Sequence, residues 1–218
     1  ERANVRDLTG AITSLRQSLK FNKNNVEARN LLGLVYFETG EVVAALSEWV
    51  ISKNLRPKKN IADDYINMIQ TNQNRLDIIN QTIKKYNQAL TYCNQDSLDL
   101  AVIQLKKVLS LNPRFIRAHQ LLALLYINNE EWEKAKKELT KCIEIDTNNI
   151  ATLRYLKEVD EMLMPEEGVK SPSRKKQKSD EIIKYQSGNE TIIQPMNVKE
   201  GKGVTSLLNL GIGIVIGL

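Results

Sequence analysis

The amino-acid sequence predicts an all-α fold, in which antiparallel helical hairpins stack into an α-solenoid. Apolar residues recur at helical spacing, as in Leu121, Leu125 and Tyr126. The sequence also repeats with a period of about 34 residues, which is the interval from Ala101 to Ala135. A single hairpin cannot bury its apolar stripe alone, so neighbouring hairpins must pack together.

The same period relates other positions, because Ala45 follows Ala11, and Tyr126 follows Tyr92, at the same interval. Three stretches share a pattern of small, bulky and turn residues: Leu32, Gly33, Tyr36, Gly40, Ala45, Trp49 and Pro57 in 26–59; Ala89, Tyr92, Ala101, Leu105 and Pro113 in 82–115; Leu122, Ala123, Tyr126, Ala135 and Leu139 in 116–149. This pattern resembles the tetratricopeptide repeat family. The resemblance implies a solenoid whose first helices line a concave groove that binds a protein or a peptide.

The expected repeats begin with a partial one. Residues 1–25 look like the second helix of an earlier repeat, whose first helix is missing or truncated. Small residues such as Gly33 and Ala45 leave room for the two helices of a hairpin to pack closely. The later repeats depart from the family pattern at Gln88, where Leu is usual, and at Thr147, where Pro is usual.

One segment breaks the period. The interval from Ala45 to Ala101 exceeds one period by too little for a full hairpin, so 60–81 is predicted to be an inserted helix region. We expect a helix capped by Asn60, then a second helix over about 75–94. A single added helix changes which side the later helices present, so we expect a break in the superhelix and a groove split between two halves.

The repeat domain is predicted to span 1–164 and to end in an amphipathic capping helix, 150–164. Residues 165–203 lose the helical period and gain Ser, Gly, Pro and charge, which predicts a charged flexible linker. Residues 204–218 carry no charge and are mostly apolar, and we interpret them as the start of a truncated transmembrane helix. Since the chain begins at Glu1 and stops inside this run, we expect it to be a fragment.

The formal net charge is +5 and the pI is about 9.1, but charges of both signs are interspersed, so no nucleic-acid partner is expected. Lys and Arg accumulate on the cytoplasmic side of membrane spans, and here Lys199 and Lys202 precede the apolar run. We therefore expect a single-pass membrane protein with its repeats facing the cytoplasm, similar to bacterial membrane-anchored tetratricopeptide proteins. The spacing of Gly213 and Gly217 favours self-association of the predicted span.

Candidate catalytic residues are few, so no enzyme activity is predicted. His119 stands at a repeat position where Trp is common, and Cys93 and Cys142 lie in apolar helical patterns as small core residues. No phosphate-binding glycine loop and no spacing of metal ligands occurs. We expect no cofactor and no metal, and a reducing compartment fits the two cysteines.

The groove is the better place to look for function. The family register predicts that nine residues face it: Asn30, Leu34, Phe37, Tyr86, Leu90, Asn94, Gln120, Leu124 and Ile127. As a set they are apolar with amide edges, which suits an amphipathic helix or an extended segment. Some family members bind acidic chaperone tails through a clamp of Lys, Asn and Arg. Leu34, Leu90 and Leu124 stand where that clamp needs Asn, so clamp binding is not implied.

Together these observations predict a membrane-anchored scaffold for protein–protein interaction, with a partner bound in the groove. The alternative is the regulatory or docking region of a larger enzyme or assembly factor, whose active part lies beyond residue 218.

Overall fold

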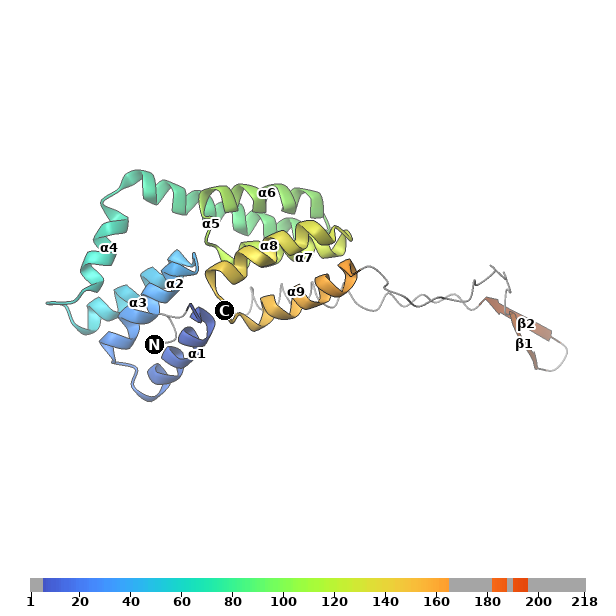
Figure 1. The fold of residues 1–218 in the computed structure, drawn as a ribbon, viewed down its shortest axis with the longest axis horizontal. Coiled ribbons are helices and arrows are strands. Elements are labelled where there is room, and N and C mark those ends of the chain that lie inside the picture. The colour runs from blue at the N-terminus through green and yellow to red at the C-terminus, as the bar shows by residue number, and fades with distance from the viewer. Residues whose placement is uncertain (1–5, 165–181, 188–189, 196–218) are drawn as a thin grey trace.

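The computed structural model describes residues 6–164, 182–187 and 190–195 (Figure 1). The helices in these residues are α1 (Leu8–Phe21), α2 (Val26–Glu38), α3 (Val42–Leu55), α4 (Ala62–Gln70), α5 (Gln73–Asn94), α6 (Leu98–Leu111), α7 (Ile116–Asn128), α8 (Trp132–Ile145) and α9 (Ile150–Leu163). Residues 6–164 contain helices and turns only, so the expected helical-hairpin solenoid is confirmed for this part of the chain.

Local sequence explains where the helices begin. Asx side chains accept a hydrogen bond from the backbone N–H three residues ahead and so cap the N-termini of four helices: Asp7 for α1, Asn25 for α2, Asn72 for α5 and Asn149 for α9. The second helix of each hairpin instead follows a tight turn that contains a residue in the left-handed region. These residues are Gly40, Asp96 and Glu130, with φ of 77°, 56° and 58°.

The helices form two blocks, which Figure 1 shows side by side. We call α1–α4 the N-terminal block and α5–α9 the C-terminal block. Each block has its own core, built around Trp49 in the N-terminal block and around Leu105 and Leu139 in the C-terminal block. Helix α4 rises along the left of the view and α5 runs across its top to the other block, so the superhelix is interrupted between the two blocks.

Helix α4 occupies the position of a first helix in the repeat that follows the α2–α3 hairpin. Ala62 and Ile66 lie one repeat period after Ala28 and Leu32, and all four side chains are buried. The helix is assigned from Ala62, after Ile61, and Asn60 still caps its first turn as predicted, because the Asn60 side chain accepts a hydrogen bond from the backbone N–H of Ala62. Asn60 is buried, and its side chain also donates to the Ser52 hydroxyl.

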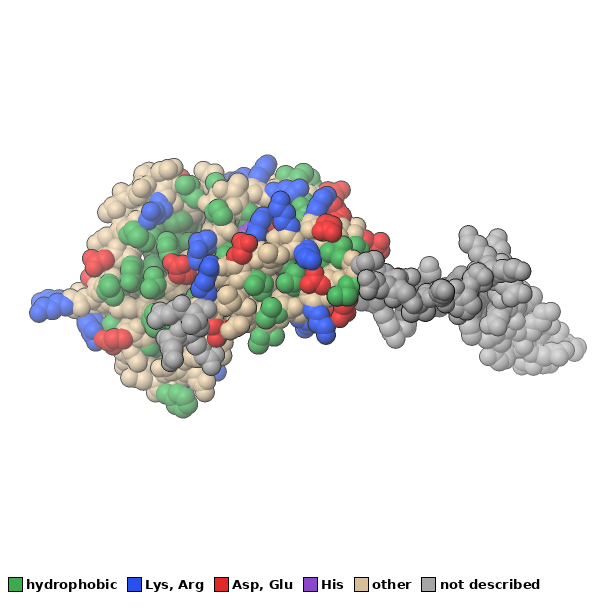
Figure 2. All heavy atoms as spheres, in the orientation of Figure 1, with side chains coloured by type: hydrophobic (Ala, Val, Ile, Leu, Met, Phe, Trp, Pro, Cys, Tyr) green, Lys and Arg blue, Asp and Glu red, His purple; other side chains and the backbone are tan. Residues whose placement is uncertain are grey.

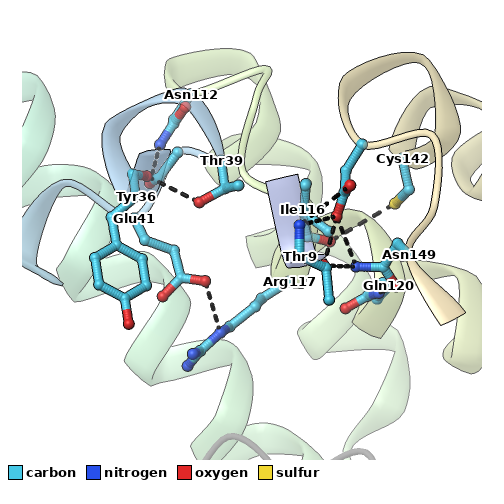
Figure 3. A network of polar contacts seen from close by, with 12 residues as sticks. Thr9, Tyr36, Thr39, Glu41, Asn112, Ile116, Arg117, Gln120, Cys142 and Asn149 are labelled. Carbon is cyan, nitrogen blue, oxygen red and sulfur yellow. Dashed lines mark hydrogen bonds and ion pairs between the residues drawn. The ribbon is translucent and has the colours of Figure 1, made fainter. Parts of the chain in front are cut away.

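The two blocks meet along a seam that no repeat pattern predicts. A third apolar cluster joins Leu8, Ala11 and Val35 of the N-terminal block to Ile116, Cys142 and Ile145 of the C-terminal block. Polar contacts surround it, and Figure 3 shows their network. At one end, the turn before α1 lies on the turn after α8; at the other, the turn after α2 lies on the turn before α7.

A β-hairpin lies within the segment that the sequence predicts to be a linker. Strand β1 (Ile182–Ser187) pairs antiparallel with β2 (Glu190–Pro195), with Ile182 opposite Pro195. In the sequence, both strand segments contain Ile, and they are separated by Gly188-Asn189. Such a dipeptide is typical of two-residue hairpin loops.

The predicted membrane span, 204–218, lies outside the described residues, as does most of the predicted linker. Within the described ranges, no helix combines the length and the apolar character needed to cross a membrane. The membrane anchor therefore stays a prediction from the sequence.

Candidate interaction cleft

A cleft of about 780 Å³ opens between the two blocks. One wall is formed by the end of α2 and the first half of α3, the opposite wall by α5, and the floor by the turn between α6 and α7. Figure 2 shows hydrophobic side chains gathered on this face of the N-terminal block, beside α4 and below the beginning of α5. Residues that line the cleft include Arg16, Tyr36, Phe37, Glu41, Val42, Val43, Ser47, Glu48, Arg75, Ile79, Ile83, Tyr86, Phe115 and Arg117.

The shortness of α4 explains why this space is open. The first helices α2 and α7 have 13 residues each, whereas α4 has 9. Because α4 runs antiparallel to α3, it covers only the second half of α3: Tyr65 stacks on Trp49 with ring centroids 4.9 Å apart, and Lys53 pairs with Asp63 at 2.5 Å. The first half of α3 has no such cover from α4, and Val43 there is 54% exposed.

The walls are largely apolar. Ile79 and Ile83 are one helical turn apart on α5 and face the cleft opposite Val42 and Val43 of α3. Phe115 closes the floor and packs on Tyr86, with ring centroids 4.8 Å apart. Facing apolar walls of this kind suit an apolar side of a protein segment.

The carboxylates of the cleft are already paired. Glu41 lies 3.0 Å from the Arg117 guanidinium across the seam, and Glu48 lies 2.7 Å from Arg29. Burial raises the pKa of Glu41 above its ordinary value, and the nearby Arg117 and Arg16 charges oppose that rise. Figure 3 shows the Glu41–Arg117 pair bridging the two blocks.

Two arginines at the cleft have no such partner among the described residues. Arg16 donates from Nε to the Tyr36 hydroxyl at 2.7 Å, and Arg75 donates to the Met68 carbonyl at 3.2 Å. In this part of the chain, neither guanidinium lies within ion-pair distance of a carboxylate. A guanidinium carries five N–H donors, so both retain donors for another molecule.

Two tyrosines are further polar groups of the cleft. Burial raises the pKa of Tyr36, although the Arg16 charge and hydrogen bond oppose that rise. Tyr86 is only 7% exposed, and its hydroxyl has no hydrogen-bond partner in the described residues. Burial likewise raises the pKa of Tyr86. Both phenols are therefore neutral hydrogen-bonding groups at any ordinary pH.

The floor of the cleft is held by the seam. The Asn112 side chain donates to the Gly40 carbonyl at 2.8 Å, and the backbone N–H of Ile116 donates to the Thr39 carbonyl at 3.3 Å. Arg114 pairs with Glu38 at 2.7 Å beside them. These bonds fix the end of α2 on the start of α7, so they set the distance between the cleft walls.

The nine residues predicted to face the groove do not lie together. Phe37 and Tyr86 line the cleft. Asn30 bonds Asn60, and Gln120 bonds Asn149 and Thr152, so these amides serve internal contacts. The other predicted residues are Leu34 and Leu90, which are half-buried against the two cores, and Asn94, which is exposed at the end of α5.

Two of the nine are corrected by the structure. Leu124 and Ile127 are buried, at 3% and 5% exposure, and belong to the same core cluster as Tyr155 and Val159 of α9. A partner cannot reach them in this state, because the capping helix completes the core over this part of α7. The repeat register assigns residues to a helix face, but it does not specify what covers that face.

Several cleft residues were missed by the sequence reasoning. Ile79 lies in the segment interpreted as an insertion. Ile83 follows just after that segment, and the repeat register does not place it in the groove. Their spacing with Tyr86, at i, i+4 and i+7, is an apolar helical stripe that could have indicated a surface. Arg16 and Arg117 carried no sequence signal, because they reach the cleft only through the docking of the two blocks.

The remaining candidates for chemistry are structural. His119 is buried, with Nδ1 2.6 Å from Glu138 Oε2 and Nε2 2.9 Å from the Pro113 carbonyl. Burial raises the pKa of Cys93 to about 11 and that of Cys142 to about 12, so neither thiol is a ready nucleophile. In the described residues, no group of three or more potential ligands could hold a metal ion.

Comparison with known proteins identifies the repeats. The model of the family described as TPR repeat matches residues 7–40, and the model described as Tetratricopeptide repeat matches residues 116–149. The second match coincides with α7 and α8, which form one hairpin. The first match covers α1 and α2, so it joins the second helix of one repeat to the first helix of the next. The chain therefore contains tetratricopeptide repeats. Proteins of this class form elongated helical stacks whose surfaces bind other proteins.

The chain also has a limited similarity to several solved structures, at low sequence identity. A crystal structure of MamA has 21% identity and a TM-score of 0.37, covering 74% of this chain and 82% of that one. The TPR domain of P58(IPK) has 16% identity and a TM-score of 0.42, covering 74% and 53%. The first TPR of Spaghetti (RPAP3), bound to an HSP90 peptide, has 16% identity and a TM-score of 0.36, covering 63% and 92%. A search of curated proteins finds no match.

Proposed function

We propose that this protein is a scaffold that binds a segment of another protein in the cleft between its two blocks. The observation that carries the proposal is the cleft itself, about 780 Å³ in volume, with apolar walls from α3 and α5. Val43 is 54% exposed in one wall, and exposed apolar residues gathered in a cleft are typical of sites for protein segments.

The site differs from the groove that the repeat register predicts. First helices line that groove, and α7, which supplies the last third of its predicted residues, is largely buried here. The cleft instead uses α5 and the uncovered half of α3. A partner bound there would contact both blocks at once, so its binding would also depend on the seam.

Site-specific photo-crosslinking tests this proposal. A photoreactive phenylalanine analogue at Val43 is expected to form an adduct with the partner in cells that make the protein. The matched control is the same analogue at Leu153 on α9, which is 43% exposed and lies away from the cleft. The adduct from position 43 should disappear when Ile83→Glu places a charge in the opposite wall. Equal adducts from both positions, or an adduct that survives Ile83→Glu, would contradict the proposal.

We further propose that residues 204–218 anchor the protein in a membrane with its repeats on the cytoplasmic side. The support comes from the sequence: the segment has no charged residue, and Lys199 and Lys202 precede it. Carbonate-resistant membrane association of the chain, lost in a version that ends at residue 203, is the expected result. Protease protection in sealed vesicles would report the side on which the repeats lie.

A further inference from the structure

We infer that the occupant of the cleft is an amphipathic α-helix of the partner that carries acidic residues beside its apolar face. This inference rests on the proposed function and specifies the chemistry of the partner. It comes from two independent observations: the place of the cleft in the repeat stack, and the two arginines at the cleft that no described carboxylate pairs with.

The place of the cleft indicates a helix. In the regular part of the stack, a 13-residue first helix packs along the preceding second helix, as α7 does on α6. Helix α4 follows the same register on α3 but ends after 9 residues, at Gln70. The turn that α4 lacks would lie along Val42, Val43 and Ser47, which is where the cleft is found. A helix from outside can therefore continue the packing that α4 begins.

The second wall adds a further requirement. Ile79 and Ile83 of α5 face the cleft, so an inserted helix would touch apolar residues on two sides. Helices pack with their axes about 8–10 Å apart, and a helix between α3 and α5 needs small or apolar residues toward both. The apolar face of the inserted helix is therefore wider than a narrow stripe. Polar residues occupy the side that faces the solvent.

The charges of the cleft indicate an acidic partner. Glu41 and Glu48 each have an arginine within 3.0 Å, so they offer little to a basic partner. Arg16 and Arg75 have no carboxylate within ion-pair distance among the described residues, and their remaining N–H donors suit carboxylates of the occupant. A basic helix would meet these arginines with like charge.

The test is a selection from a library of helix-forming peptides, using the whole chain of residues 1–218 as bait. The library varies apolar residues at i, i+3, i+4 and i+7 and randomises the flanking positions among Glu, Lys and Gln. We expect the enriched peptides to carry Glu rather than Lys at the flanks. We expect their affinity to fall with added salt, because the contacts are between exposed charges. A proline at the centre of the best peptide should abolish binding, because it breaks a helix.

Variants of the protein locate the contacts. Arg16→Glu and Arg75→Glu should each lower the affinity of the best peptide about five-fold, while Lys137→Glu, a matched reversal on α8 away from the cleft, should leave it unchanged. Val43→Glu should remove binding. The Arg75 side chain reaches the surface, so thermal unfolding of Arg75→Glu should match that of the unchanged protein. Arg16→Glu also removes the hydrogen bond to the Tyr36 hydroxyl, so Tyr36→Phe, which loses the same bond but keeps the arginine, is its control.

The outcomes separate this inference from the proposed function. Enriched peptides that bind through Val43 but prefer Lys, or that tolerate the central proline, would overturn the acidic helix and leave the cleft as the binding site. Peptides whose binding is insensitive to both Val43→Glu and Ile83→Glu would overturn the proposed site, and the inference with it.

Discussion

The carboxylate of Asp146, at the end of α8, accepts a hydrogen bond from the backbone N–H of Leu8, at the start of α1, with a distance of 2.9 Å. The same carboxylate accepts from the backbone and hydroxyl of Thr9. Asp146 is fully buried, so a charge removed from water is compensated by donors at a helix N-terminus. This contact joins the first and the last repeat and holds one end of the seam.

Asp146→Ala should destabilise the protein by about 3 kcal/mol, because it leaves the donors of Leu8 and Thr9 buried without an acceptor. Urea unfolding measures the change. Glu144→Ala, an exposed carboxylate two residues earlier, is the control and should cost less than about 0.5 kcal/mol. If the two variants unfolded at the same urea concentration, Asp146 would not hold the seam.

Gly40→Ala should destabilise the other end of the seam by roughly 2–4 kcal/mol, because it combines left-handed strain with a clash. Gly40 has φ of 77°, and a Cβ there would lie 2.6 Å from the Cα of Phe115. That backbone cannot move unless the blocks separate. Asp96→Gly, at the equivalent turn of the next hairpin, is the control and should be neutral or slightly stabilising, because that residue also has positive φ. Small-angle scattering should show a larger radius of gyration for Gly40→Ala only.

Glu138 gives the fold a pH dependence whose sign follows from its contacts. Burial alone would raise its pKa, but hydrogen bonds from His119 and Lys141 outweigh burial and lower the pKa below its ordinary value of 4.5. The unfolded chain then binds the proton more readily than the folded protein, so the stabilisation is complete above about pH 4.5 and is lost as the pH falls through the folded-state pKa.

Glu138→Gln should accordingly cost about 1 kcal/mol near neutral pH, since a charged acceptor is replaced by a neutral one. The difference between the two proteins should shrink as the pH falls toward about 3. Thermal unfolding across this range measures it. Glu133→Gln on the exposed side of α8 is the control. A constant difference at every pH would mean that the Glu138 charge does not contribute.

Tyr86→Phe should raise stability by about 1 kcal/mol, because it removes a buried hydroxyl that has no hydrogen-bond partner in the described residues. Tyr36→Phe is the contrasting variant and should lower stability, since the Tyr36 hydroxyl accepts from Arg16 at 2.7 Å. Urea unfolding of both variants tests the pair. A loss of stability in Tyr86→Phe would indicate that its hydroxyl is hydrogen-bonded in solution.

The sequence predicted the parts of the fold that local patterns determine. Helical spacing and the repeat period gave the helical hairpins, and the positions of small residues such as Ala89 and Ala123 gave their close packing. The seam could not be predicted in this way. Leu8 and Asp146 are 138 positions apart, and the sequence around Asp146 reads only as a turn. Contacts at that distance depend on where α4 and α5 carry the chain.

The candidate site was predicted only in part for the same reason. Phe37 and Tyr86, which the repeat register assigns to the groove, both line the cleft. The register also placed Leu124 on a surface, but α9 packs over that part of α7. A repeat pattern defines which side of a helix is turned inward, whereas exposure depends on neighbouring elements that the pattern does not include.

Gly33 and Trp49 provide the sharpest test of how the repeats pack, because each hairpin solves the same contact with a different pair. A Cβ on Gly33 would lie 2.4 Å from Nε1 of Trp49, which is fully buried. In the next hairpins the equivalent pairs are Ala89 with Leu105, and Ala123 with Leu139. A larger residue on the first helix is thus matched by a smaller one on the second.

A double-mutant cycle follows from these pairs. Gly33→Ala alone should cost roughly 1–3 kcal/mol by overpacking, and Trp49→Leu alone roughly 2–4 kcal/mol by leaving a cavity. Combined, they recreate the Ala–Leu pair of the other hairpins, so Gly33→Ala should cost less in the Trp49→Leu background, with a coupling of at least about 1 kcal/mol. Urea unfolding of the four proteins measures that coupling. Additive effects would mean that the two side chains do not limit each other, and that the spacing of α2 and α3 is set elsewhere.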